Sequence, residues 1–239
     1  MTKYQYTPDN TWMAKDAKLL IDFDSTFIKL EGLDELAKLV SSTGGSNSDT
    51  IEQIEKLTQL GMEGKISFEE SLSRRIKMLE FKQADLAELI TLLRANISDS
   101  VLRNQSKFLQ HAENIYILSG GFEDFIIPIV ESFGISSQHV IANKFIFDSR
   151  GVCRGYEPDR LTAQSGGKLR AAKELAQTGR ITASKTIAVG DGYTDLEIKL
   201  GGGADKFIAF SENTSRASVQ DQADLVTADF GEVFEYVFG

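Results

Sequence analysis

Short apolar runs alternate with segments of helical periodicity along most of this chain, and this alternation restricts its fold more than any other feature. Such runs are typical of parallel strands that helices cover on both faces. We therefore expect an open α/β sheet whose ligands bind at the carboxyl ends of the strands. The predicted strands are Lys18 to Phe23, Asn114 to Leu118, His139 to Ala142, Lys185 to Val189, Lys206 to Phe210 and Asp224 to Ala228.

The stretch from Leu33 to about Ala112 departs from this alternation. Its apolar residues recur at helical spacing, as in Leu86, Leu89 and Leu93, which predicts helices and no strand. We expect a helical cap domain at residues 33–102, inserted into a core of residues 1–32 and 103–239. Further on, KFIFDSRGVCRGY at residues 144–156 places a turn-forming SRG between two apolar or aromatic arms, which predicts a small β-hairpin.

The composition narrows the range of partners. The 239 residues include 26 basic and 35 acidic ones, a formal net charge of -9, so the surface would repel nucleic acids and anionic membranes. Cys153 is the only cysteine, which excludes an intramolecular disulfide or a cysteine-built metal site, and His111 and His139 share no ligand spacing. We find no signal-peptide pattern and no apolar run of membrane-spanning length. We therefore expect a cytoplasmic protein without nucleic-acid or membrane partners.

Two carboxylates follow the first predicted strand at once, in the sequence KLLIDFDST. Alternation along an extended chain puts Asp22 and Asp24 on the same side, roughly 6 to 7 Å apart. Two converging carboxylates repel each other unless a cation, a shared proton or water relieves them. An Asp-x-Asp pair in a loop is more often a turn or a helix cap, but its position at a strand end indicates a functional site.

Three further features follow later strands. Ser119 in IYILSGGF precedes two glycines whose backbone N–H groups can approach an anion closely. Lys168 in SGGKLRAAKEL lies in the first turn of a helix, where the helix dipole disfavours a cation unless an anion is near. Asp191 and Asp195 in TIAVGDGYTDLEI form a second acidic pair at a strand end. Taken singly, the Ser119 motif fits an ordinary strand-to-helix turn, and Lys168 fits a solvated surface lysine.

Together, the acidic pair, the hydroxyl, the lysine and the second acidic pair stand in the order found in the haloacid dehalogenase superfamily, which this chain resembles over nearly its whole length. The resemblance implies a Rossmann-like core and a phosphatase reaction through an aspartyl-phosphate. It implies Asp22 as the nucleophile and Asp24 as the general acid and base. Ser119 and Lys168 are then ligands of the phosphoryl oxygens. The implied cofactor is Mg²⁺, bound by Asp22, Asp24, Asp191 and Asp195.

The chemistry explains why these residue types are needed. A carboxylate that attacks a phosphate dianion meets electrostatic repulsion, which a hard cation and a lysine offset while they stabilise the transition state. Mg²⁺ prefers oxygen ligands from a few carboxylates plus water. Because Asp24 lies two residues beyond Asp22 and points the same way, it can protonate the leaving oxygen and later take a proton from water.

Within the superfamily, five motifs of the chain resemble those of the phosphoserine phosphatase family in order: DFDSTFIKLEG, GMEGKISFEESLSRR, LSGGF, TAQSGGK and GDGYTD. This resemblance implies hydrolysis of O-phosphoserine, the last step of serine biosynthesis. The glutamate and the cap arginine that meet the substrate ammonium and carboxylate fall on Glu31 and Arg75. The last motif departs from the pattern, since it carries Thr194 where many relatives have asparagine. The implied substrate-binding residues are Glu31, Met62, Phe68, Arg75, Ser119, Gly120, Lys168 and Thr194.

Two alternatives stay open at this point. The same scaffold could hydrolyse another small phosphomonoester, such as phosphohomoserine. A phosphoaspartate signalling domain of the receiver type also combines an aspartate, a hydroxyl, a lysine and Mg²⁺. A receiver is much shorter, its phosphorylated aspartate follows a later strand, and it has no use for an inserted cap. The predicted partner is therefore a small phosphomonoester.

Overall fold

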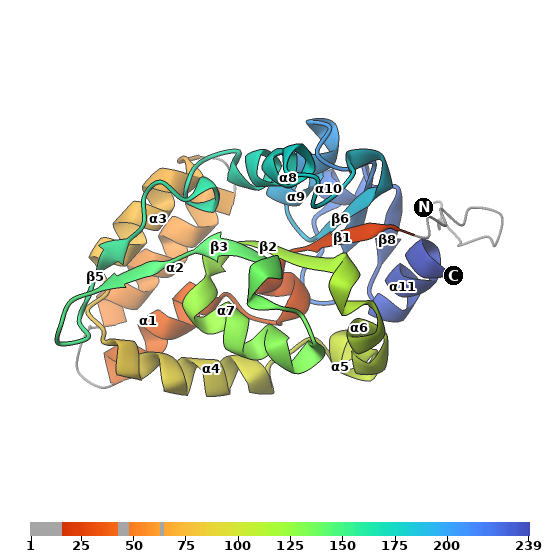
Figure 1. Cartoon of the computed structure of the whole chain (residues 1–239). Coiled ribbons are helices and arrows are strands. Elements are labelled where there is room, and N and C mark those ends of the chain that lie inside the picture. Colours follow the sequence, from red (N-terminus) through yellow and green to blue (C-terminus); the bar gives the residue numbers. More distant parts are fainter. Residues whose placement is uncertain (1–15, 43–47, 63–64) are drawn as a thin grey trace.

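The computed structural model describes residues 16–42, 48–62 and 65–239, and a six-stranded sheet forms its centre (Figure 1). Neighbouring strands all pair in parallel, in the order β3-β2-β1-β6-β7-β8. The predicted α/β fold is confirmed, and each predicted strand is present. The strands are β1 (Lys18–Ile21), β2 (Ile115–Phe122), β3 (Val140–Asn143), β6 (Thr186–Gly190), β7 (Lys206–Phe210) and β8 (Leu225–Thr227).

The order of the strands changes direction at β1. The chain passes from β1 to β2 and β3 on one side, and then crosses to β6, β7 and β8 on the other. Connections that run away from each other leave a crevice at the carboxyl ends of the two central strands. Ile21 of β1 lies in register with Val189 of β6. The residues that follow these strands, Asp22 and Asp191, therefore meet at the crevice.

Alternation along β1 separates two apolar layers. Leu19 and Ile21 belong to one layer and Leu20 to the other, as the two-residue period of a strand requires. Helices cover both faces, as predicted (Figure 1). The first layer includes residues of α5 (Asp99–Arg103), α6 (Gln105–His111), α7 (Glu123–Val130) and α11 (Phe230–Phe238). The second includes residues of α8 (Gly167–Gln177), α9 (Tyr193–Leu200) and α10 (Ala217–Gln220).

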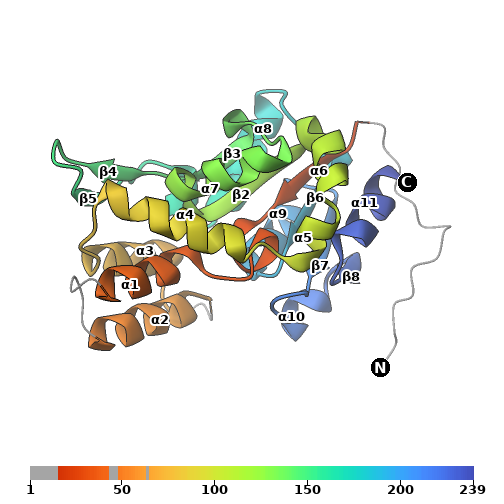
Figure 2. The ribbon, with the colours of Figure 1, turned by 90° about the horizontal axis from the view of Figure 1, so that it is seen from below.

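Helices occupy the stretch that was expected to lack strands: α1 (Gly32–Ser42), α2 (Ser48–Met62), α3 (Phe68–Lys77) and α4 (Leu86–Ala95). They lie beyond one end of the sheet, and α1 packs against α2 and α2 against α3 (Figure 2). Leu36, Ile54 and Leu72 belong to the same apolar layer as Leu19 and Ile21 of β1. One continuous core thus joins these helices to the sheet, and the division into a core and a cap at residues 33–102 stays a proposal.

Strands β4 (Phe145–Phe147) and β5 (Cys153–Tyr156) form the predicted antiparallel hairpin. The hairpin reaches the segment between α3 and α4, where the ring centroids of Phe145 and Phe81 lie 5.0 Å apart. The backbone N–H of Cys153 also donates to the Phe81 carbonyl oxygen at 2.9 Å. The hairpin, which lies at residues 145–156, therefore supports the cap between α3 and α4. This contact is distant along the chain from both points where the cap joins the core.

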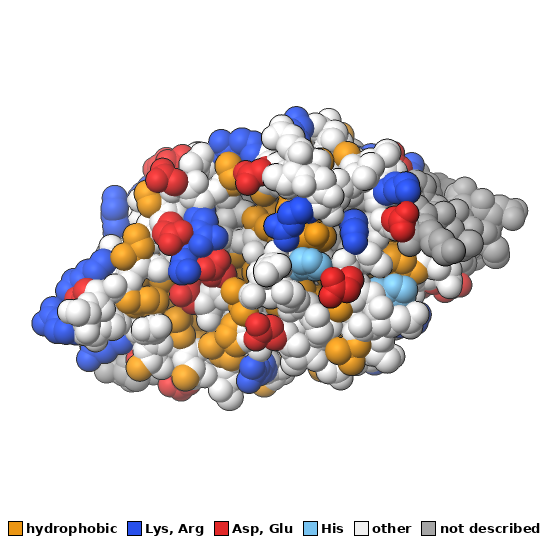
Figure 3. Space-filling view, in the orientation of Figure 1, with side chains coloured by type: hydrophobic (Ala, Val, Ile, Leu, Met, Phe, Trp, Pro, Cys, Tyr) orange, Lys and Arg blue, Asp and Glu red, His pale blue; other side chains and the backbone are white. Residues whose placement is uncertain are grey.

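The surface and the helix lengths bear on the expected partners. Acidic and basic side chains are interspersed on the face seen in Figure 3, and basic ones gather at the end where the hairpin projects. Across the described ranges, we find no helix with both the length and the apolar character that a bilayer span requires. The predicted absence of nucleic-acid and membrane partners stays a prediction.

Candidate active site

A cavity of about 620 Å³ lies between the carboxyl ends of the central strands and the cap helices. Asp22, Asp24 and Asp191 line it from the sheet, and Phe68 and Arg75 line it from the cap. A cavity of this size accepts a small-molecule ligand. The cavity has two ends. The sheet end is formed by Asp22, Asp24, Lys168, Asp191 and Asp195, and the cap end by Glu31, Thr58 and Arg75, together with Asp34 as the ion-pair partner of Arg75.

The turn after β1 carries the first acidic pair. β1 ends at Ile21, two residues earlier than predicted, and a tight turn follows over residues 23–27. Asp22 and Asp24 keep extended backbone angles, with ψ of 157° and 139°, whereas Ser25 adopts a φ of 54°. A positive φ is strained for a residue other than glycine, and Ser25 is the only such residue in the described ranges. The side-chain amide of Asn213 supports the turn by donating to the Ser25 carbonyl oxygen at 3.2 Å.

Lys168 connects the two acidic pairs. Its Nζ lies 2.6 Å from Asp22 Oδ1 and 2.8 Å from Asp195 Oδ1. Burial alone would lower the pKa of Lys168, but the carboxylates of Asp195 and Asp22 outweigh it and raise this pKa above its ordinary value. Gly167 allows the helix to begin here, because a Cβ on it would lie 1.9 Å from the Leu161 carbonyl oxygen. Lys168 is a buried cation between two anions, so the surface-lysine interpretation is wrong.

Three buried carboxylates form a group that could hold a metal ion. One oxygen from each of Asp22, Asp191 and Asp195 lies within 4.8 Å of the other two. Burial, followed by the charge of Asp22, raises the pKa of Asp195 to about 7, and the same two causes raise the pKa of Asp191. A dication would offset the repulsion among these groups, and Mg²⁺ prefers such oxygen ligands. The residues therefore fit the implied metal.

Among the described residues, the grouped carboxylates do not include Asp24, although the family resemblance implied Asp24 as a metal ligand. Its Oδ1 accepts a hydrogen bond from the Gly32 backbone N–H at 2.7 Å, and its Oδ2 would lie 2.9 Å from a Cβ on Gly121. Burial raises the pKa of Asp24 to about 7. A carboxyl group that titrates near neutral pH can both donate and accept a proton. The geometry favours the acid–base role of Asp24 over the role of a side-chain metal ligand.

Strand β2 continues through the predicted phosphate-binding turn. It was expected to end at Leu118, but it runs on to the start of α7 with a register shift in its pairing to β3. Ser119 is fully buried, and its Oγ accepts a hydrogen bond from the Gly121 backbone N–H at 2.9 Å. A Cβ on Gly120 would lie 2.7 Å from the Phe68 ring. Gly120 lets the strand and the cap approach closely, and the role of Ser119 as a phosphoryl ligand stays a prediction.

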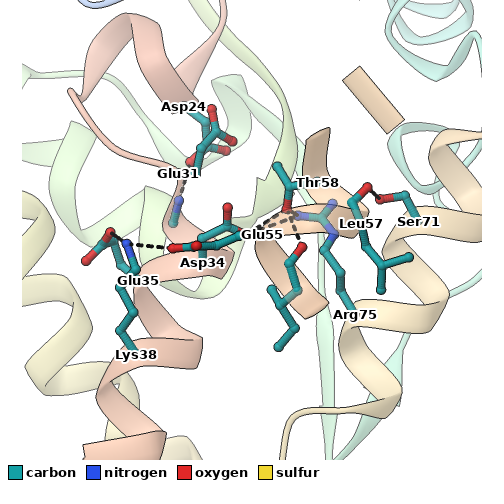
Figure 4. Close-up of polar contacts among 12 residues, drawn as sticks. Asp24, Glu31, Asp34, Glu35, Lys38, Glu55, Leu57, Thr58, Ser71 and Arg75 are labelled. Atoms are coloured by element: carbon teal, nitrogen blue, oxygen red, sulfur yellow. Dashed lines mark hydrogen bonds and ion pairs between the residues drawn. The ribbon is translucent and has the colours of Figure 1, made fainter. Parts of the chain in front are cut away.

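The cap end holds the acidic and basic groups of the predicted substrate site. Glu31 accepts a hydrogen bond from Ser25 Oγ at 2.7 Å, and burial raises the pKa of Glu31 well above its ordinary range. NH1 of Arg75 lies 3.0 Å from Thr58 Oγ1 and 3.6 Å from Asp34 Oδ1. Burial lowers the pKa of Arg75, and the charge of Asp34 counteracts this. Figure 4 shows Arg75 reaching from α3 toward Asp34 on α1 and Thr58 on α2.

Most of the predicted site residues meet in this one cavity. Ser119 lies beneath the lining, and the side chain of Met62 lies outside the described residues. The predicted residues that line the cavity are Asp22, Asp24, Glu31, Phe68, Arg75, Gly120, Lys168, Asp191, Thr194 and Asp195. The roles predicted for these residues stay predictions.

The sequence-based prediction missed Arg216 and Thr58, which line the cavity, and Asp34, which forms an ion pair with Arg75. Arg216 lines the cavity, and its Nε donates to Asp191 Oδ2 at 3.0 Å. It follows β7 in a stretch without a motif, and Thr58 is a single hydroxyl within a helix. Asp34 had a signal, since it lies in the first turn of a predicted helix. An acid at this position indicates a helix N-terminus rather than a binding site.

Comparisons with known proteins cover most of the chain. The family model of haloacid dehalogenase-like hydrolases matches residues 19–198. The phosphoserine phosphatase of Drosophila melanogaster is 31% identical over 89% of this chain and 74% of its own length. The phosphoserine phosphatase of Bos taurus is 29% identical over 94% of this chain and 94% of its own length. A solved structure of a phosphoserine phosphohydrolase-like protein from Francisella tularensis matches with a TM-score of 0.78 at 28% identity, over 92% of this chain and 98% of that chain.

Proposed function

This chain belongs to the haloacid dehalogenase-like hydrolases and is a phosphatase, and we propose that its substrate is O-phosphoserine. The observation that carries the proposal is that Glu31 and Arg75 share one cavity with the acidic residues of the sheet end. A carboxylate and a guanidinium complement the ammonium and the carboxylate of an amino acid. A sugar phosphate has neither an ammonium nor a carboxylate, so its binding would enclose the charges of Glu31 and Arg75 without supplying an opposite charge to either, which costs free energy.

The sheet end supplies the groups for hydrolysis in two steps. In the first step, a carboxylate oxygen of Asp22 attacks phosphorus, the bond between phosphorus and the seryl oxygen breaks, and Asp24 gives its proton to that oxygen. In the second step, Asp24 takes a proton from a water molecule whose oxygen attacks phosphorus, and the bond to Asp22 breaks to release phosphate. The pKa of Asp24, which burial raises to about 7, suits both transfers near neutral pH.

Positive charge at the sheet end favours this reaction. Lys168 keeps its proton because the neighbouring carboxylates raise its pKa, and its Nζ lies 2.6 Å from Asp22 Oδ1, next to the attacking atom. Ser119 and the backbone of Gly120 are proposed as further ligands of the phosphoryl oxygens. Mg²⁺ bound by Asp22, Asp191 and Asp195 would offset the negative charge of the phosphoryl group.

The proposed substrate also indicates the metabolic role of the protein. Hydrolysis of O-phosphoserine yields serine, so the proposal includes the last step of serine biosynthesis, carried out in the cytoplasm. Phosphohomoserine is the alternative substrate, because one additional methylene changes binding in a cavity by only about 1 to 3 kcal/mol. Steady-state rates with both esters separate the two.

A steady-state panel of five phosphate esters on the wild type and on Arg75→Ala tests the proposal. The esters are phosphoserine, phosphohomoserine, phosphothreonine, phosphoethanolamine and an aryl phosphate. Loss of Arg75 leaves the substrate carboxylate buried and unpaired, so kcat/KM for phosphoserine should fall by roughly 30- to several-thousand-fold, about 2 to 5 kcal/mol. The aryl phosphate and phosphoethanolamine lack the carboxylate, so their hydrolysis should change little.

The ranking of the esters on the wild type decides the substrate. We expect phosphoserine to rank first and phosphoethanolamine to be a poor substrate. If phosphoserine ranks no better than the aryl phosphate, or if Arg75→Ala slows all five esters equally, the phosphoserine assignment is wrong while the phosphatase assignment stands. A first rank for phosphohomoserine would select the alternative.

A further inference from the structure

A buried polar cluster joins the first three cap helices. Thr58 Oγ1 in α2 donates to Asp34 Oδ1 in α1 at 2.8 Å and accepts from NH1 of Arg75 in α3 at 3.0 Å. The same NH1 lies 3.6 Å from Asp34 Oδ1. The side chains of Arg75 and Asp34 are only 9% and 11% exposed. Figure 4 shows the three side chains converging from separate helices.

The cluster engages only one end of the Arg75 guanidinium. Thr58 and Asp34 both contact NH1, whereas Nε of Arg75 is buried and has no hydrogen-bond partner in the described residues. A buried N–H group without a partner costs free energy. The planar guanidinium offers Nε and the adjacent NH2 together as a fork for a carboxylate. Because Arg75 lines the cavity and its Nε has no protein partner, this edge is left for the carboxylate of a ligand.

The position of Glu31 suggests a second role for the cluster, which is to keep Arg75 from pairing with Glu31. Burial lowers the pKa of Arg75, and the negative charges of Asp34 and then Glu31 counteract it, so Glu31 is within electrostatic reach of Arg75. A carboxylate and a guanidinium in one cavity would neutralise each other if they paired, and neither would then be open to a zwitterion. In the described part of the chain, the ion pair of Arg75 is made with Asp34 rather than with Glu31. Asp34 and Thr58 thus keep the two recognition charges separate.

From these contacts we infer that Asp34 and Thr58 are positioning residues, which hold NH1 of Arg75 and turn its Nε edge toward the substrate carboxylate. The inference rests on the proposed function, in which Arg75 binds that carboxylate. Without the two partners, the long side chain of Arg75 would sample other rotamers or pair with Glu31. Either change has to be reversed before the substrate binds, which lowers affinity. Asp34 and Thr58 therefore act on selectivity through Arg75.

The hydroxyl of Thr58 can be removed with little change of shape. Thr58→Val deletes the hydroxyl, and Thr58→Ser retains it. Ser71→Ala is the matched control, because Ser71 also lines the cavity and its Oγ is also a buried hydroxyl between α2 and α3, but it donates to the Leu57 carbonyl oxygen at 2.8 Å rather than contacting Arg75. Asp34→Asn is a second test of the cluster, since it keeps an acceptor for Thr58 and removes the charge that balances Arg75.

The quantity to measure is the ratio of kcat/KM for phosphoserine to kcat/KM for 4-nitrophenyl phosphate. Thr58→Val should lower this ratio by about 10- to 100-fold, the usual effect of a misplaced binding group, mainly through KM for phosphoserine. Thr58→Ser should restore most of the ratio, Asp34→Asn should lower it, and Ser71→Ala should keep the wild-type value. On an Arg75→Ala background, Thr58→Val should have no further effect on the ratio, because it acts through Arg75.

Several outcomes would overturn the inference. They are a wild-type ratio in both folded Thr58→Val and Asp34→Asn, an equal fall in Ser71→Ala, and a further fall when Thr58→Val is added to Arg75→Ala. Failure of the proposed function looks different, because the wild type itself would then show no preference for phosphoserine over 4-nitrophenyl phosphate, and both conclusions would be wrong.

Discussion

The two ends of the cavity are built from different kinds of structure. At the sheet end, Asp22 and Asp191 directly follow two paired strands, and Lys168 lies in the first turn of α8. At the cap end, Asp34 and Arg75 come from separate helices, α1 and α3, which both pack against α2. The backbone hydrogen bonds of a sheet fix the spacing of the first set, whereas side-chain packing between helices sets the spacing of the second. We therefore expect the sheet end to tolerate less displacement than the cap end.

The two ends also differ in charge. At the sheet end, four carboxyl groups face the cations Lys168 and Arg216. At the cap end, Glu31 and Asp34 face Arg75. The hydroxyl of Ser25 donates a hydrogen bond to Glu31, and the hydroxyl of Thr58 donates one to Asp34. An excess of carboxylates suits a dication, while a nearly balanced set suits a zwitterion whose own charges cancel. The comparison predicts that changes at the sheet end stop the reaction and that changes at the cap end alter selectivity and stability.

The largest effect is expected for the nucleophile of the sheet end. Asp22→Asn should lower kcat by about 10⁴-fold or more while the fold persists, because an amide is a poor nucleophile and a poor metal ligand. Phosphate release and circular dichroism measure the two properties, and Asp221→Asn on the exposed surface is the control. Near-wild-type turnover by folded Asp22→Asn would contradict the covalent mechanism.

The lifetime of the acyl-phosphate in the wild type separates an enzyme from a signalling domain. An acyl-phosphate that persisted for minutes without ester hydrolysis would favour a signalling role.

Alanine substitutions at two glycines can compare the rigidity of the two ends of the cavity. A Cβ on Gly190 would lie 2.3 Å from the carboxyl carbon of Asp195, which Lys168 holds in place. A Cβ on Gly120 would lie 2.7 Å from the ring of Phe68, which belongs to a cap helix. Gly190→Ala should therefore reduce kcat/KM by about 10²-fold or more, and Gly120→Ala by about tenfold or less. Equal losses in steady-state assays of the two variants would show that the ends yield to the same extent.

Metal binding should stabilise the protein through the sheet end alone. Mg²⁺ at 100 times its Kd should raise the free energy of unfolding of chelator-treated wild type by about 2.7 kcal/mol, which a rise in Tm reports. Asp191→Asn removes one of the three grouped carboxylates and should reduce this rise. Asp34→Asn, at the cap end, should retain it. The same rise in both variants would contradict the metal site, and its loss in both would contradict the separation of the two ends.

The smallest effect is expected for Glu31 at the cap end. Burial raises the pKa of Glu31, so the folded state disfavours its carboxylate form. The stability that comes from protonated Glu31 is complete below the ordinary glutamate pKa of about 4.3 and is lost as the pH rises through the folded value. Glu31→Gln avoids this loss, so the variant should exceed the wild type by about 0.5 to 2 kcal/mol at neutral pH.

Urea unfolding without metal measures this difference at neutral pH and near the ordinary glutamate pKa. The two proteins should become more alike as the pH falls. A variant that is less stable than the wild type at neutral pH would show that Glu31 is a net stabilising ion in the folded protein. The same variant should lose its preference for substrates that carry an ammonium group.

Much of the sheet end could be predicted, although its details could not. The sequence led to the correct strands and to acidic residues at their ends, but β1 ends at Ile21 and β2 runs past Ser119. The ends of strands depend on hydrogen bonds to neighbouring strands, as with the bond from the Asp22 N–H to the Val189 carbonyl oxygen at 2.9 Å. Lys168 looked like a surface lysine when taken alone, because its two partners are distant in sequence.

The sequence by itself determined the elements and which residues follow them. Apolar periodicity distinguishes strands from helices, and parallel strands bring the residues after them to one edge, so Asp22 and Asp191 were expected at the same edge. The pairing of β1 with β6 then brings these two residues together. Only the tertiary structure decided the partners of Arg75. Thr58 and Asp34 lie on other helices, and helical periodicity predicts which face of a helix is buried but not which residue of a neighbouring helix it meets. That choice depends on how the helices cross, which the packing of the whole cap against the sheet and the hairpin sets.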